Sequence, residues 1–250
     1  MDPVRFSNLK AIAQSPAHYL HRVRNYDSQK GRPLTVGTAV HSMLLGGAAI
    51  VVFSGATRRG KEWDAFKAEH EGAVILSRSE HAAAIGMANA VQRCKPALEL
   101  LTGETEVELP TWKLCGRECG GRVDVRTPRR VVELKTSVTA QPDRFKRLAT
   151  RMAYHAQLAW YLDGNAESGG TAREAYVVAV ESSPPFVVTP MQLTERMIDA
   201  GRKLYRLWFE QLLSCEQANE WPGYVQDIID FDLDDADDVE LTFGEEEDVA

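Results

Sequence analysis

The stretch GRVDVRTPRRVVELK, residues 121–135, decides which fold we expect for this chain. Its two ends, 121–126 and 131–135, are short and rich in valine, as β-strands are. Between them, residues 127–130 contain a proline, which favours turns. The pattern therefore predicts two neighbouring strands joined by a tight turn.

This pair of strands also predicts a chemical site. Side chains alternate between the faces of a strand, so Glu133 and Lys135 share one face while Leu134 points into the core. Asp124 lies nine residues before Glu133, and the turn brings it alongside. Two carboxylates and a lysine can then converge on one point. A surface hairpin with an ion pair would show the same residues, so this spacing alone leaves both interpretations open.

The rest of the chain predicts helices around this sheet. Ser7, Ser15-Pro16 and Thr35 are expected to begin helices. Expected helices lie at about 36–45, 61–70, 79–94, 142–151, 152–162 and 193–217, and further strands at about 104–109, 112–116, 175–181 and 186–189. In the last helix, a face with Leu204, Leu207, Trp208 and Leu212 is expected to pack into the core. This order predicts an α/β fold with a small mixed β-sheet flanked by helices.

The composition fits one domain with a tail. A chain of 250 residues with 44% apolar residues can bury one substantial core. We expect a single domain over 1–226, with a helical N-terminal part to about 100, a catalytic sheet-helix core to about 190 and a final helix to about 217. The apolar run at 48–53 is far shorter than the roughly 20 residues of a membrane helix, and no signal peptide is evident. Four cysteines without a CxxC pair indicate reduced thiols, so we expect a cytoplasmic protein.

The net charge of -7 is unevenly distributed. Residues 227–250 contain 12 acidic residues and no basic ones, so residues 1–226 carry 29 basic and 24 acidic side chains, a net charge of +5. An acidic run of this kind is usually solvated, although it could also compete with DNA or bind a partner. The basic body is compatible with nucleic-acid binding.

The expected convergence of Asp124, Glu133 and Lys135 suits one chemistry in particular. Mg²⁺ is a hard cation that is commonly held by one or two carboxylates and keeps several waters. The metal lowers the pKa of a bound water, and a lysine can orient or deprotonate that water. These residues therefore predict metal-assisted hydrolysis of a phosphodiester.

Residues elsewhere in the chain could complete such a site. The segment GTAVH ends at His41 in an expected helix, and Gln157 and Tyr161 are spaced i and i+4 on one face of the helix after the sheet. These residues could also have purely structural roles. His41 could be a hydrogen-bonded core histidine. Tyr154, Trp160 and Tyr161 could likewise be core aromatics, and we expect Trp160 to be one.

The order GxxxH, aspartate, ExK and QxxxY resembles the RecB-type branch of the PD-(D/E)XK (restriction-endonuclease-like) nuclease superfamily. Within it, FSNLK at 6–10, SPAHY at 15–19 and YHAQLAWYLDG at 154–164 resemble phage and prophage exonucleases of the exonuclease VIII (RecE) type. The resemblance extends over about 6–181. The core order of this family, helix, three strands, helix and strand, agrees with the order expected above.

This resemblance implies roles for the residues of the strand pair. Asp124 and Glu133 would be metal ligands, the Leu134 carbonyl could complete the shell, and Lys135 would be the catalytic lysine. Val123 stands where the family often has proline, a departure that changes little because the backbone need only form a strand.

The resemblance implies roles for more distant residues as well. His41 would be a further metal ligand or would hold the scissile phosphate, and Gln157 and Tyr161 would position the DNA strand or support the lysine. An acidic residue on the first strand often joins the site in this family. We prefer Glu106 to Glu108 for this role, although both stay open.

The activity that the resemblance implies is that of a Mg²⁺-dependent exodeoxyribonuclease, with Mn²⁺ expected to substitute. It would degrade one strand of linear duplex DNA from an end, in the 5′ to 3′ direction. The resemblance further implies a ring-shaped trimer or tetramer around the DNA, and a single-strand annealing protein as partner. The number of metal ions stays open.

Phosphate contacts are expected from a cluster of cations before the Gln157 helix, with Tyr154 beside them and no base-specific readout. These cations are Arg144, Lys146, Arg147 and Arg151. Two other functions stay open. A RecB-like endonuclease, or a nuclease for single-stranded or branched DNA, would keep the same site. A non-catalytic scaffold that binds DNA ends would use the carboxylates only structurally.

Overall fold

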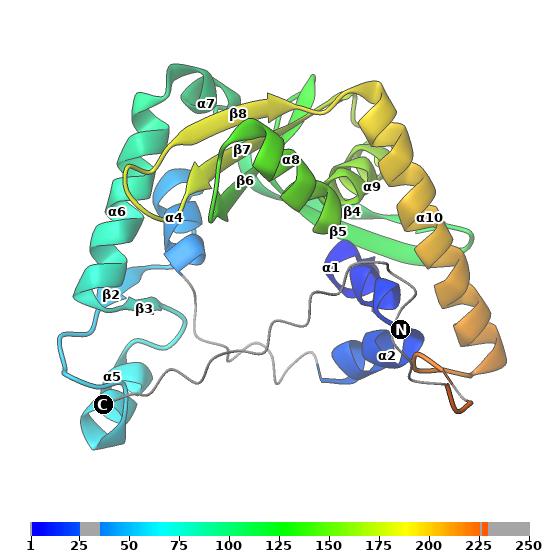
Figure 1. Cartoon of the computed structure of the whole chain (residues 1–250), viewed down its shortest axis with the longest axis horizontal. Helices are drawn as coiled ribbons and strands as arrows, with labels where there is room; N and C mark the ends of the chain where they lie inside the picture. Colours follow the sequence, from blue (N-terminus) through cyan, green and yellow to red (C-terminus); the bar gives the residue numbers. More distant parts are fainter. Residues whose placement is uncertain (1, 26–35, 226, 230–250) are drawn as a thin grey trace, which may run out of the picture.

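The computed structural model describes residues 2–25, 36–225 and 227–229 (Figure 1). Its centre is a mixed sheet in the order β1-β5-β6-β7-β8, with β4 also paired to β5. The strands are β1 Val4–Arg5, β4 Glu104–Leu114, β5 Arg117–Arg126, β6 Arg130–Ser137, β7 Glu174–Glu181 and β8 Val188–Gln192. β6 is parallel to β7 and β1 is parallel to β5, whereas the β4-β5, β5-β6 and β7-β8 pairs are antiparallel.

Helices cover both faces of this sheet. They are α1 Phe6–Leu9, η1 Lys10–Ala13, α2 Pro16–Arg24, α4 Val36–Leu45, α5 Gly60–Glu69, α6 Arg78–Arg93, α7 Lys95–Leu100, α8 Pro142–Arg151, α9 Tyr154–Glu167 and α10 Glu195–Ala218. Two short strands, β2 Ile50–Val52 and β3 Val74–Leu76, pair in parallel apart from the main sheet. The expected α/β fold, a mixed sheet flanked by helices, is therefore confirmed. Within the described ranges, every helix is too short or too polar to span a bilayer.

The main sheet separates two apolar cores. On one face, Trp160 of α9 and the side chains of α10 pack with Val131 and Val177. On the other face, α4, α6 and α7 pack with Leu134 and Val178. Leu134 is fully buried as predicted, and burying a leucine contributes about 1.5–3 kcal/mol to folding. Strand β6 therefore has a core on each face, and this anchors the strand that carries Glu133 and Lys135.

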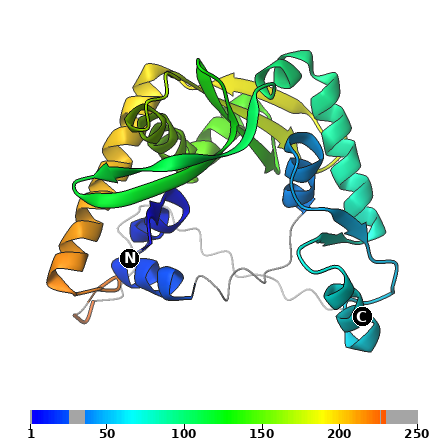
Figure 2. The ribbon, with the colours of Figure 1, turned by 180° about the vertical axis from the view of Figure 1, so that it is seen from behind.

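Figures 1 and 2 show the molecule as an arch from opposite sides. One limb consists of α6 with α5, β2 and β3 near its far end, and we call it the α5 limb. The other consists of α10 with α1 and α2, and we call it the α2 limb. The sheet joins the two limbs, with α4 on the inner side of the first and α1 on the inner side of the second.

Strand β4 differs from the sequence prediction. The two strands expected at 104–109 and 112–116 form one strand, with a register shift between Leu109 and Trp112. Pro110 lies in this irregular part, where its missing N–H does not interrupt the hydrogen-bond ladder. Strand β5 likewise continues through Gly120 and Gly121, because the neighbouring strands supply the hydrogen bonds that local propensity does not predict.

Other parts of the fold are missed or misassigned by sequence patterns. The elements β1, β2, β3 and α7 have two to six residues each, too few to show a period. In α10, Leu207 is 61% exposed, which corrects its predicted place in the core. The buried face instead follows Tyr205, Trp208 and Leu212, and Leu207 lies one residue off that series. The predicted cap Thr35 and most of the acidic tail at 227–250 lie outside the described residues.

Candidate active site

Strands β5 and β6 separate at Asp124. Their ladder contains two residue pairs, both next to the turn at 127–130. Beyond these pairs, side chains bond to the backbone of the opposite strand: the Leu134 amide donates to Asp124 Oδ2 at 2.8 Å, and the Asp124 amide donates to Glu133 Oε1 at 3.5 Å. We call this arrangement the carboxylate fork. It explains why both acidic side chains tolerate half-buried or buried positions between the strands.

Glu133 is the centre of a hydrogen-bond network that reaches α9. Its side chain is 3% exposed, and its Oε2 accepts bonds from Lys135 Nζ at 2.7 Å and Gln157 Nε2 at 3.1 Å. Gln157 Nε2 also lies 3.0 Å from Tyr161 Oη. The structure thus brings together the strand residues and the i, i+4 pair of α9 that the sequence analysis singled out.

The network depends on a close approach between β5 and α9. A Cβ atom at Gly121 would lie 2.9 Å from Cε1 of Tyr161, closer than normal packing allows. At the adjacent Gly120, a Cβ would meet only Pro3, at an ordinary 3.6 Å. Glycine is therefore required at one of these two positions and not at the other.

We expect Gly121→Ala to lower the free energy of unfolding by about 1–3 kcal/mol, because the Tyr161 ring must move to admit the methyl group. Gly120→Ala is the matched control, and its unfolding midpoint should stay close to that of the unmodified protein. Thermal unfolding of the two variants measures the difference. Equal unfolding midpoints would show that the Tyr161 ring can move to admit the methyl group without loss of stability.

A group of potential metal ligands lies across from the network. His41 on α4, Glu106 on β4 and Asp124 on β5 each offer one ligand atom, and these atoms all lie within 4.8 Å of one another. His41 Nδ1 is 3.6 Å from Asp124 Oδ2. An imidazole with two carboxylates can hold a divalent cation. Glu133 is not in this group; its carboxylate accepts hydrogen bonds from Lys135 and Gln157.

The position of Glu106 follows from strand register. Thr105 pairs with Val125 and Val107 with Val123, so Glu106 faces Asp124 across the ladder. Its φ angle of 51° lies in the left-handed region, an uncommon and strained conformation for glutamate. Glu108 also lines the same cavity and forms an ion pair with Arg5, but it is not in the group of ligand atoms with His41 and Asp124.

Burial and neighbouring charges shift the pKa values of three side chains in the site. Burial, followed by the nearby Glu133 carboxylate, raises the pKa of Asp124 well above its usual range. Burial and Lys135 lower the pKa of His41, which favours the neutral imidazole that binds metals. Burial acts to lower the pKa of Lys135, but the Glu133 and Asp124 carboxylates outweigh it and raise that pKa. The lysine is therefore an ammonium ion at neutral pH.

These side chains line one cavity of about 970 Å³ under the sheet. Its walls include all the predicted catalytic and metal-binding residues, namely His41, Glu106, Asp124, Glu133, Leu134, Lys135, Gln157 and Tyr161. Tyr154 also belongs to the wall, and Lys135 Nζ lies 5.0 Å from the centre of its ring. This cation–π contact adds an aromatic partner to the ammonium group besides Glu133.

The four cations of α8 that were predicted to contact phosphates lie outside this cavity. Their side chains are exposed on α8 and do not line this cavity; the residues are Arg144, Lys146, Arg147 and Arg151. The cavity contains other cations, Arg5 and Arg122, that the sequence analysis did not assign to the site. Arg122 Nε lies 3.1 Å from Glu106, a pairing that only the β4-β5 register reveals.

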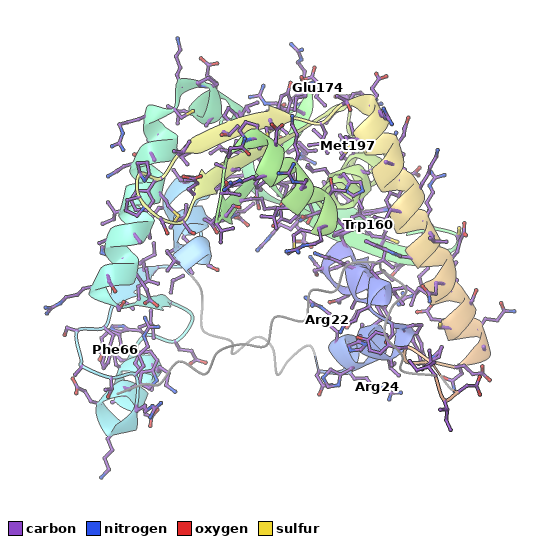
Figure 3. All side chains as sticks on the ribbon, viewed as in Figure 1. Arg22, Arg24, Phe66, Trp160, Glu174 and Met197 are labelled. Atoms are coloured by element: carbon purple, nitrogen blue, oxygen red, sulfur yellow. The ribbon has the colours of Figure 1, made fainter. Side chains whose placement is uncertain are left out.

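A second cavity of about 540 Å³ adjoins the first and shares Phe6, Ser7, Tyr154 and Gln157 with it. Its walls contain Lys10 and Arg22 and no acidic residue among those described. Burial, then Lys135 and Arg22, lower the pKa of Lys10, as expected for cations that face one space. Figure 3 labels Arg22 on the α2 limb. No local pattern marks these two residues, because their partners are distant in sequence.

Comparisons with known proteins address the fold. A solved structure of a candidate exonuclease from Eubacterium rectale is similar over 91% of each chain, with 12% identity and a TM-score of 0.58. A phage-related exonuclease from Haemophilus somnus 129PT aligns with 72% of this chain and 96% of its own, at 11% identity and a TM-score of 0.33. A comparison with curated proteins finds no match. The family described as a PDDEXK-like domain of unknown function (DUF3799) matches residues 5–230. The chain therefore belongs to this PDDEXK-like family.

Proposed function

We propose that this protein is a Mg²⁺-dependent exodeoxyribonuclease that degrades one strand of linear duplex DNA. The observation that carries the proposal is the common cavity that holds the His41, Glu106 and Asp124 group together with the Glu133-Lys135 pair. Two acidic ligands, a histidine and a fixed ammonium group around one space suit phosphodiester hydrolysis. Membership of a PDDEXK-like family agrees with this chemistry.

The donor set fits a hard divalent cation. Asp124 and Glu106 would supply oxygen ligands and His41 a neutral nitrogen, and Glu133, whose Oε1 accepts from the Asp124 amide, would join them on exchanging its lysine contact. We propose Mg²⁺ as the ion, with Mn²⁺ as a substitute, because carboxylates favour both. The bound ion would lower the pKa of a water and offset charge on the phosphate.

The protein's own groups would orient the substrate. Lys135 carries its charge beside Glu133 and under the Tyr154 ring, where it can bond to a phosphate oxygen or hold the attacking water. Gln157 and Tyr161 keep Glu133 in place through their shared hydrogen bonds. This makes Lys135 a catalytic residue and Gln157 and Tyr161 positioning residues.

The second cavity supports a path for a nucleic-acid strand. Lys10 and Arg22 line a cavity without acidic residues among those described, and this cavity shares Phe6, Ser7, Tyr154 and Gln157 with the cavity of the site. We propose that a DNA backbone passes from one cavity to the other and that these two cations contact its phosphates.

Replacing both cations, Lys10→Gln with Arg22→Gln, should weaken DNA binding about tenfold at 0.1 M salt and reduce the salt dependence by about one to two counterions, as two lost phosphate contacts require. The comparison variant is Arg144→Gln with Arg147→Gln on α8, which removes the same charge from outside both cavities. Fluorescence anisotropy across a salt series measures both. A larger loss of DNA affinity in the α8 variant would show that the DNA contacts the α8 cations predicted from the sequence, and not Lys10 and Arg22.

The function itself is tested with linear duplexes labelled at the 5′ or the 3′ end, in Mg²⁺ or in chelator, beside circular duplex. An exonuclease releases mononucleotides from one end in Mg²⁺ only and leaves circles intact, and we expect the 5′ end. Cleavage of circles would instead indicate an endonuclease. If neither substrate is cut, and if Asp124→Ala or Glu133→Ala leaves the binding of DNA ends unchanged, the result supports a non-catalytic scaffold that binds DNA ends.

Two parts of the proposal concern partners. We propose a ring-shaped trimer or tetramer that encircles the duplex, and a single-strand annealing protein that receives the exposed strand in recombination. Both rest on the family resemblance in the sequence. The mass of the protein in solution, with and without DNA, tests the first, and co-purification with the annealing protein tests the second.

A further inference from the structure

A cation that the proposed hydrolysis does not use lines the cavity of the site. Arg122 lies on β5 two residues before Asp124, so both side chains are on one face of the strand. The Arg122 side chain is 62% exposed and belongs to the same cavity wall as the proposed metal ligands. Its charge is therefore accessible to a substrate that enters this cavity.

Two ion pairs with β4 determine which acidic residue holds Arg122. In the β4-β5 ladder, Arg122 is the partner of Glu108, but the Glu108 carboxylate forms an ion pair with Arg5. Arg122 Nε instead lies 3.1 Å from Oε2 of Glu106. Glu106 is itself one of the proposed metal ligands. The guanidinium group is thus held next to the proposed metal site.

A guanidinium group in this position can bind a second anion. It is planar and has five N–H donors, and a carboxylate pairs with two of them at most. The contact of Nε with Glu106 therefore leaves donors for a phosphate oxygen. The Glu106 carboxylate has two oxygens, so one can ligate an ion while the other stays paired with Arg122. The contact that holds the arginine is thus compatible with both a bound ion and a bound phosphate.

We propose that Arg122 is a further catalytic residue, which binds the substrate phosphate at the metal ligands while Glu106 holds its guanidinium group in place. The inference rests on the proposed function, because it requires a phosphodiester in this cavity. Strand β5 pairs with β4 along one edge and with β6 along the other. Lys135 belongs to β6, whereas Arg122 is held by a residue of β4. The two cations would therefore offset the phosphate charge from opposite sides of Asp124.

Arg126 provides a matched control on the same strand. It lies four residues after Arg122, on the same face of β5, and forms the same kind of ion pair, with Glu104 of β4 at 2.6 Å. Arg126 does not line the cavity of the site. The variant Arg126→Gln therefore removes one positive charge and one β4-β5 ion pair from outside the cavity.

DNA binding is measured first, in Mg²⁺, with a duplex whose end linkages are phosphorothioates, which hydrolyse slowly. Arg122→Gln should weaken binding about three- to tenfold at about 0.1 M salt and reduce the salt dependence by about one counterion, as one lost phosphate contact requires. Arg122→Lys should keep the salt dependence, because it keeps the charge. Arg126→Gln should change neither quantity. Fluorescence anisotropy across a salt series measures all three variants.

Hydrolysis and metal binding then separate contact with DNA from support of Glu106. With end-labelled duplex, kcat should fall about 10²-fold in Arg122→Gln. It should fall at least about tenfold in Arg122→Lys, because an ammonium group lacks the planar fork that can pair with two anions at once. Affinity for Mn²⁺, measured by calorimetry without DNA, should not fall in Arg122→Gln, because this change removes a positive charge from beside the ligands.

Two results would overturn the proposal. One is an unchanged DNA affinity and salt dependence in Arg122→Gln. The other is a loss of Mn²⁺ affinity large enough to account for the lost hydrolysis, which would make Arg122 a support for Glu106 alone. Absence of hydrolysis by the unmodified protein contradicts the proposed function instead, and loss of one counterion in Arg122→Gln would then still identify a phosphate contact at this residue.

Discussion

Lys135→Met should remove hydrolysis and destabilise the fold at the same time. The lysine is the charged partner of Glu133, whose side chain is 3% exposed. Removing one member of a buried ion pair leaves an uncompensated charge and costs about 3–5 kcal/mol. For a chain of this size, that lowers the unfolding midpoint by on the order of 10 °C. Hydrolysis should fall by about 10³-fold, the effect of losing several kcal/mol of transition-state stabilisation.

A double variant separates the two effects. Lys135→Met with Glu133→Gln removes both charges, so the unfolding midpoint should recover most of the loss. Its hydrolysis should stay as low as that of the single variant. Calorimetry and end-labelled duplex provide the two measurements. A single variant with an unchanged midpoint would show that water reaches Glu133 and that the pair is not buried in solution.

Asp124→Asn should have effects of opposite sign on activity and stability. Loss of a ligand carboxylate should reduce Mg²⁺-dependent hydrolysis by about 10³-fold. In chelator, however, the variant should be more stable than the unmodified protein at pH 7, by on the order of 1 kcal/mol or about 2–4 °C. Its amide can still accept the hydrogen bond from the Leu134 backbone while it removes the repulsion with Glu133.

The sign follows from the raised pKa of Asp124. A carboxyl that binds its proton more tightly in the folded state stabilises that state at low pH, and this contribution is lost as pH rises through the folded pKa. The metal-free protein should therefore gain stability relative to Asp124→Asn as pH falls below 7. The affinity for metal should fall as pH falls, because protons compete with the ion for the same carboxylate. Unfolding midpoints at pH 5 and pH 7, with and without Mg²⁺, test both statements, and a pH-independent difference would contradict them.

The parts of the site that the sequence predicts are those set by local geometry. Alternation along one strand places Glu133 and Lys135 together, and helical spacing places Gln157 and Tyr161 together. The turn at 127–130 then adds Asp124. These relations link residues that are close in the sequence, so local spacing is enough to predict them.

The remainder depends on long-range register. Glu106 and Glu108 have the same strand parity, and only the pairing of β4 with β5 shows which one faces Asp124. Lys10 and Arg22 lie in the second cavity, next to the site, because the N-terminal helices pack against α10, a contact between opposite ends of the chain. The cations of α8 looked suitable because they cluster in sequence, but the exposed side of that helix carries them away from the cavity.

The carboxylate fork makes two backbone amides part of the site. The Asp124 and Leu134 amides donate to side-chain oxygens and not to carbonyls of the ladder. Any ion that draws on those oxygens must weaken or re-form these bonds. Hydrogen–deuterium exchange at the two amides should therefore change when metal is added, while amides at the paired end of β6 stay constant. The sheet itself would act as the indicator of metal occupancy.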